Sequence, residues 1–179
     1  HVAEVASEYF VMKGQEKDAA RYKAAMKDCK SWQAKTRMAE DANKNTTSMF
    51  SSAKTALQNE IKAALGAAKD PYEKAAWLKA WSSELRNFES IPKYTLPDQP
   101  IPVRTQAVTC LIDACRDKNF DAYFAGEGYL IKAQIGGYLA TAMKSGDPGI
   151  IALIAGAISD PKTGLKEIFK ERKTDLNKA

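Results

Sequence analysis

The chain has 179 residues, of which 45% are apolar and 27% charged, a balance that is typical of globular proteins and argues against disorder. Its 27 basic and 22 acidic residues give a formal net charge of +5. The sequence holds no run of about 18 uncharged apolar residues, which argues against a membrane-spanning helix.

The first predicted element is a helix over residues 2–41, in which apolar side chains recur at three- and four-residue steps between Tyr22 and Trp32. From Lys13 to Arg37 there are eight basic residues against three acidic ones. A lysine-rich helix face can neutralise the phosphates of a nucleic acid. The candidate phosphate-binding residues are Lys13, Lys17, Arg21, Lys23, Lys27 and Lys30. The alternative is a solvated surface that only aids solubility.

A second helix is predicted over residues 48–68, and a third has a clear start. Asp70 can accept amide hydrogen bonds as the N-cap, and Pro71 suits the first helical position. Glu73 stands three residues after the cap, as in a capping box. We expect this third helix to carry the aromatic residues that follow.

Three large aromatic residues, Trp77, Trp81 and Phe88, recur at helical spacing after this start. The spacing of the two tryptophans predicts that their rings lie on the same side of the helix. One interpretation is that these residues fill the core between helices. The other is that they bind a partner protein, because large aromatic side chains are enriched at binding hot spots.

A proline-rich segment, residues 91–104, contains four of the seven prolines. Proline lacks an amide donor and disfavours a helical conformation in the residue before it. The segment is therefore predicted to be an extended linker between a three-helix lobe, residues 1–90, and a second helical lobe, residues 105–179. Each lobe is of a size, roughly 75 to 90 residues, at which a helical core is marginally stable without further packing.

Beyond the linker, Thr105 and Asn119 are predicted to cap two short helices. Residues 129–143 are apolar and rich in small side chains, and Asp147 and Asp160 each precede a proline that can begin a further helix. The second lobe is therefore predicted to contain an apolar helical hairpin. The whole chain is expected to be all-α, with six to seven helices in two small lobes.

Residue patterns that support catalysis or metal binding are absent from the sequence. His1 is the only histidine, which argues against hydrolytic triads, and no pair of cysteines or histidines has zinc-ligand spacing. The glycines form no phosphate-binding loop, and Glu40 with Asp41 is interpreted as solvated helix surface. We therefore predict a protein that is not an enzyme and needs neither a cofactor nor a metal.

The cysteines and the first residue leave the cellular compartment open. Cys29, Cys110 and Cys115 are an odd number, so they are either small buried side chains in a reducing compartment or one disulfide with a free thiol. The chain begins with His1 rather than Met, so we expect a trimmed N-terminus. Neither a cytoplasmic nor a secreted location is favoured.

The leading functional hypothesis is a non-catalytic helical interaction protein that binds itself or a larger protein assembly. One alternative is non-specific coating of nucleic acid by the lysine-rich face. The other is a secreted or membrane-active helical protein whose apolar hairpin inserts into lipid, at the cost of burying two lysines.

Overall fold

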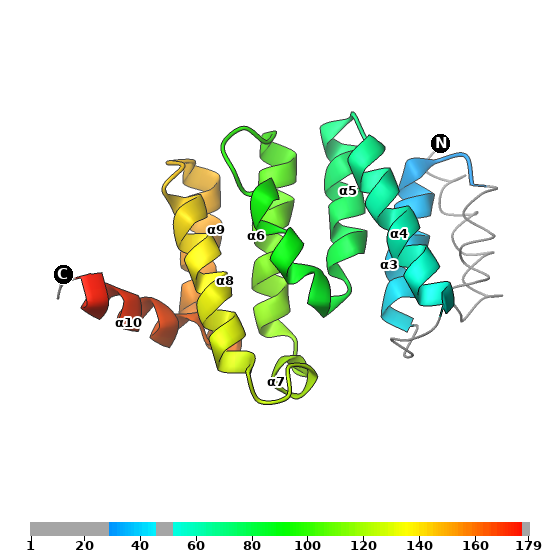
Figure 1. The fold of residues 1–179 in the computed structure, drawn as a ribbon. Coiled ribbons are helices and arrows are strands. Elements are labelled where there is room, and N and C mark those ends of the chain that lie inside the picture. Colours follow the sequence, from blue (N-terminus) through cyan, green and yellow to red (C-terminus); the bar gives the residue numbers. More distant parts are fainter. Residues whose placement is uncertain (1–28, 46–51, 177–179) are drawn as a thin grey trace. The chain divides into compact units, whose positions relative to one another are not determined.

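The computed structural model describes residues 29–45 and 52–176, whose regular secondary structure is entirely helical (Figure 1). This part of the chain contains eight α-helices, α3 to α10, and three short 3-10 helices, η1 to η3. The predicted all-α class is confirmed, with more helices than the six to seven expected. The chain divides into two compact units, the first ending at Asn87 and the second beginning at Phe88.

The described part of the first unit contains three α-helices, each of which packs against the other two. They are α3 (Trp32–Asn45), α4 (Ser52–Ala67) and α5 (Pro71–Ser82). Their apolar stripes meet in a core that includes Met38, Leu57, Ile61, Trp77 and Leu78. Burial of these side chains, at about 1.5 to 3 kcal/mol each, is the main favourable contribution to this unit.

The helix predicted over residues 2–41 is interrupted in the described part of the chain, because residues 29–31 are not helical. The hydroxyl of Ser31 accepts a hydrogen bond from the Ala34 amide at 3.2 Å, which is the N-cap contact of a new helix. The earlier part of that prediction lies outside the described residues. The second predicted helix is found as α4, within slightly narrower bounds.

The predicted start of the third helix is confirmed. The carboxylate of Asp70 accepts hydrogen bonds from the amides of Tyr72 and Glu73 at 2.8 and 3.0 Å. Its predicted extension toward Phe88 is wrong, because α5 ends at Ser82. The Asn87 side chain donates to the Trp81 carbonyl at 2.8 Å, so a side chain takes up a helix-terminal carbonyl there.

The chain does not form the extended linker predicted for residues 91–104. After η1 (Leu85–Ser90), residues Pro92–Tyr94 form the 3-10 helix η2, and α6 (Ile101–Arg116) begins within the segment. Prolines occupy the first turns of η2 and α6, where an amide has no acceptor within its helix, so the missing donor costs little. Pro92, Pro100 and Pro102 therefore lie at helix starts rather than preventing helices, and Pro97 lies in the turn between η2 and α6.

The second unit is built around α6, which buries most of its length against its neighbours. Helices α8 (Gly128–Met143) and α9 (Pro148–Ser159) form the predicted hairpin and pack against α6 and against each other. The short α7 (Phe120–Tyr123) precedes them. The unit ends with η3 (Pro161–Thr163) and α10 (Leu165–Leu176), which packs on both limbs of the hairpin (Figure 1).

The helix starts in this unit follow the sequence signals in part. Asp147 caps α9 as predicted, accepting the Ile150 amide at 3.0 Å. Asp160 instead begins η3, and Gly164, in the left-handed conformation, separates η3 from α10. Thr105 lies inside α6 rather than at its start. Asn119 occupies the cap position of α7 without a side-chain hydrogen bond to that helix.

Candidate functional site

The three predicted partner-binding aromatic residues fall in different environments. Trp77 is buried in the core of the first unit, and Trp81 is half-buried on the same helix. Phe88 is buried in the second unit, where its ring meets that of Phe124 edge-on, with centroids 5.7 Å apart. Burial of Trp77 and Phe88 agrees with the interpretation that they fill cores. Their contact with a partner stays a prediction.

The predicted phosphate-binding face falls largely outside the described residues. Of its six members only Lys30 is described, and that side chain is exposed. The other five, Lys13, Lys17, Arg21, Lys23 and Lys27, precede residue 29. Phosphate binding by this face therefore stays a prediction.

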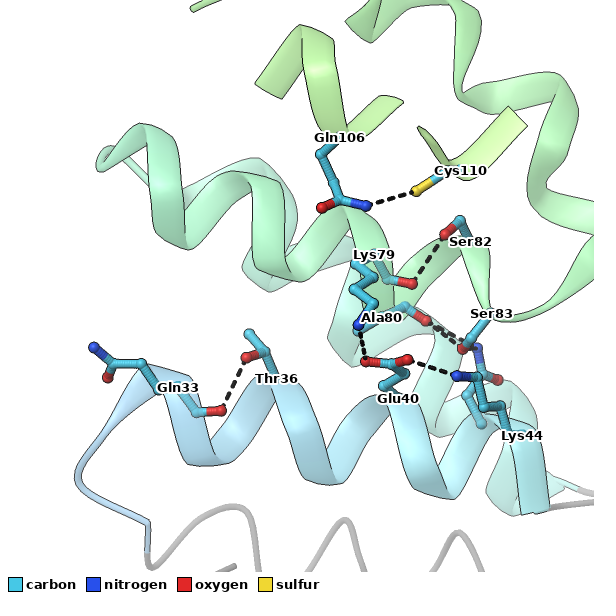
Figure 2. A network of polar contacts seen from close by, with 11 residues as sticks. Gln33, Thr36, Glu40, Lys44, Lys79, Ala80, Ser82, Ser83, Gln106 and Cys110 are labelled. Atoms are coloured by element: carbon cyan, nitrogen blue, oxygen red, sulfur yellow. Dashed lines mark hydrogen bonds and ion pairs between the residues drawn. The ribbon is translucent and has the colours of Figure 1, made fainter. Parts of the chain in front are cut away.

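A network of polar contacts surrounds the buried side chains of Glu40 and Asn43 in the first unit (Figure 2). Glu40 on α3 stands between two ammonium groups, with Lys44 Nζ at 2.6 Å and Lys79 Nζ at 3.3 Å. Nearby, Asn43 donates to the Ala80 carbonyl at 3.1 Å and to the Ser83 hydroxyl at 2.9 Å. These contacts join α3 to the C-terminal part of α5.

The interpretation of Glu40 as solvated helix surface is wrong, because its side chain is buried. Burial opposes ionisation, but the hydrogen bond and charge of Lys44, together with Lys79, outweigh it and lower the pKa of Glu40. The carboxylate is thus held ionised as part of an ion-pair network. The sequence indicates the contact between Glu40 and Lys44, because the two residues are four positions apart on one helix.

A second ion pair in this unit links Lys54 on α4 to Glu84, which follows α5. Lys54 Nζ and Glu84 Oε2 are 2.6 Å apart, and the two side chains are only 9% and 11% exposed. Sequence spacing gave no indication of this pair, because its members are 30 positions apart. Together with the Glu40 network, it connects α3 and α4 to the C-terminal part of α5 and the residues that follow it.

In the second unit, the most exposed apolar surface of α8 lies in its first turn. Tyr129 and Leu130 are consecutive, with 51% and 67% of their surface exposed. The Tyr129 hydroxyl donates to the Glu171 carboxylate on α10, and this hydrogen bond raises the pKa of Tyr129. The tyrosine ring is thereby held by α10 while much of it remains open to solvent.

The cysteines, metal sites and membrane spans can be assessed for the described residues. Cys29, Cys110 and Cys115 are all buried, and none of them is in a disulfide. The described residues hold no cluster of metal-ligating side chains. None of the helices in the described ranges has both the length and the apolar character needed to cross a membrane.

Comparison of the chain with models of protein families, with curated proteins and with solved structures finds no match.

Proposed function

We propose that the chain is a non-catalytic helical interaction protein that associates with copies of itself through the first turn of α8. The observation that carries this proposal is the adjacent exposure of Tyr129 and Leu130. Single exposed apolar residues are common on protein surfaces, but adjacent large ones supply the kind of contact that buried interfaces use. The hydrogen bond from Tyr129 to Glu171 supports the same proposal, because a tyrosine that is already ordered loses less conformational entropy on binding.

The composition of the hairpin supports the same proposal. Helix α9 leaves the small side chains Ala152, Ala155 and Gly156 exposed, so the backbone of another helix can approach it closely. The chain divides into two compact units, and a unit of this size has only a limited core. A second copy that covers the apolar turn of α8 would add to the buried surface of the unit.

Size-exclusion chromatography with light scattering over micromolar concentrations tests the proposal. The expected result is a concentration-dependent rise in mass that Leu130→Ser weakens. Tyr72→Ser is the matched control, because Tyr72 is 67% exposed, as Leu130 is, and lies in the first unit. A compact monomer at every concentration contradicts the proposal, and equal weakening by both substitutions contradicts its location on α8.

Non-specific binding to nucleic acid is the second candidate, supported by the lysine excess between Lys13 and Arg37 and by the exposure of Lys30. Lysine dominates this set, and lysine binds phosphate as a point charge without reading base sequence. The expected result is a retardation of arbitrary oligonucleotides that weakens as salt rises. Glutamine substitutions at the six candidate positions should remove it, and no retardation in low salt would exclude this candidate.

A further inference from the structure

Arg104 is a buried cation in the second unit whose hydrogen bonding is incomplete. It lies in the first turn of α6 and is only 6% exposed. Its Nη2 donates to the Ser145 hydroxyl, whereas its Nε is buried and has no hydrogen-bond partner. Among the described residues, no carboxylate forms an ion pair with it. A guanidinium stays charged in proteins, so this burial calls for a compensating negative group.

The surroundings compensate this charge only in part. The Ser145 hydroxyl donates in turn to the Ala142 carbonyl at 2.7 Å, so the arginine interacts indirectly with the C-terminal end of α8. A helix C-terminus carries a partial negative charge, smaller than that of an anion. Asp147 is the carboxylate nearest to Ser145 along the chain, but its Oδ1 accepts a hydrogen bond from the Ile150 amide and caps α9. A full negative charge is therefore missing beside Arg104.

The unsatisfied edge of Arg104 has the geometry that oxyanions recognise. Nε and Nη2 lie on the same edge of the guanidinium and can donate two parallel hydrogen bonds to two oxygens. Among the described residues, the only hydrogen-bond partner on this edge is the Ser145 hydroxyl, which belongs to a tight turn with Gly146 at a φ of +73°. The turn is exposed at Lys144 and Gly146. A ligand would therefore reach the Nε–Nη2 edge of Arg104 from the solvent side once the Ser145 hydroxyl moves.

We propose that Arg104, with Ser145 as its gate, is a binding site for a small oxyanion, either a phosphate or a carboxylate group. The oxyanion accepts hydrogen bonds from Nε and Nη2, and the Ser145 hydroxyl turns from accepting the Nη2 bond to donating to the ligand. This site is independent of the proposed surface on α8 and of the lysine-rich face.

The test is a titration of the full chain with inorganic phosphate and, separately, with acetate, at constant ionic strength kept with sodium chloride. The nitrogen–proton resonance of the Arg104 Nε group is followed by NMR and assigned by its loss in Arg104→Lys. A saturable shift of that resonance is expected in the parent. Because Arg104→Gln has no Nε group, the backbone amide resonance of Gly146 is followed in both chains, and Arg104→Gln should weaken the anion's affinity about tenfold or more. Lys118→Gln, which removes an exposed cation beyond the same helix, should leave the affinity unchanged.

The two anions distinguish the sources of the oxyanion. A shift with phosphate only assigns a phosphate site, and a shift with acetate only assigns a carboxylate site. Ser145→Ala keeps the guanidinium and removes the gate, so it provides a folded variant in which the same resonance should shift at equal or lower anion concentration. The proposal is overturned if neither anion moves the resonance in the parent and in Ser145→Ala, or if Arg104→Gln binds as the parent does.

Discussion

Lys54 Nζ and Glu84 Oε2 lie 2.6 Å apart in the first unit, and neither side chain has more than about a tenth of its surface exposed. The pair joins α4 to the residues that follow α5, two segments that are distant in sequence. A buried ion pair contributes little net stability compared with apolar residues of similar size. Removing one of its partners is nevertheless strongly destabilising, because the other charge stays buried. This asymmetry leads to the first prediction.

Lys54→Met is expected to lower the free energy of unfolding by about 3 kcal/mol, because it leaves the Glu84 carboxylate buried without its counter-charge. Urea unfolding of the parent and the variant measures this difference. The double variant Lys54→Met/Glu84→Met should recover most of the loss, and Lys62→Met, at an exposed position on the same helix, should change stability by no more than about 0.5 kcal/mol. A single variant as stable as the parent would mean that the pair is not formed in solution.

Glu40 should make stability depend on pH in the acid range. Its pKa is lowered in the folded chain, so its contribution is present above the ordinary glutamate pKa of about 4.3 and is lost as the pH falls through the folded value. The stability difference between the parent and Glu40→Gln should therefore be largest near pH 7 and shrink below about pH 4. Chemical unfolding at a series of pH values measures it, and a difference that stays constant over this range contradicts the assignment.

Two glycines of the second unit should respond to alanine in opposite ways. A Cβ at Gly128 would lie 3.0 Å from the Asp121 Cα and still closer to its carboxylate, so Gly128→Ala is expected to cost about 1 to 3 kcal/mol. Gly156 lies inside α9 with no atom within 4 Å of such a Cβ. Gly156→Ala should therefore stabilise the chain by about 0.5 to 1 kcal/mol. Thermal unfolding distinguishes the two signs, and equal shifts would contradict the close approach at Gly128.

Cys115 should resist alkylation in the folded chain. Burial raises the pKa of this thiol to about 12, and the charge of Lys132 opposes the rise only in part. At pH 8 the folded thiol is thus expected to hold about 1000-fold less thiolate than an unfolded one. Mass spectrometry of the peptide carrying Cys115, after timed exposure to iodoacetamide with and without denaturant, measures the difference. Equal rates in both conditions would show that the side chain is accessible.

Sequence reasoning succeeded where the determining interaction is local. Asp70 and Asp147 cap α5 and α9 because each carboxylate contacts amides two or three residues ahead, a relationship that spacing reveals directly. The apolar hairpin of α8 and α9 followed from two helical segments joined by a short turn. Local signals of this kind account for most of the helix starts that were predicted correctly.

The failures arose where distant residues decide the structure. The aromatic residues from Trp77 to Phe88 have helical spacing, but α5 ends at Ser82. The side chains of Ser83 and Asn87 donate hydrogen bonds to the last carbonyls of α5. Phe88 belongs to the second unit, where it packs on Phe124. The four prolines of residues 91–104 predict an extended segment, but Pro102 lies in the first turn of α6. The burial of Glu40 depends in part on Lys79, 39 positions away, which no local pattern specifies.

The candidate sites likewise depend on contacts between residues that are distant in the sequence. Tyr129 and Leu130 were placed within an apolar helix from the sequence, but their exposure depends on which face of α8 the rest of the unit covers. No sequence pattern singles out Arg104, because a lone basic residue at the end of a proline-rich segment is ordinary on a protein surface. Its burial and incomplete hydrogen bonding follow from the meeting of α6 with the turn after α8.

The two neighbouring residues Asn87 and Phe88 have a practical consequence for expressing the units separately. Asn87 closes the end of α5, whereas Phe88 supplies a ring to the aromatic cluster with Phe124. A second-unit fragment that begins at the prolines would lack Phe88, and its absence would leave a cavity beside Phe124. The peptide bond between 87 and 88 is therefore the better place to divide the gene, although it lies inside a 3-10 turn.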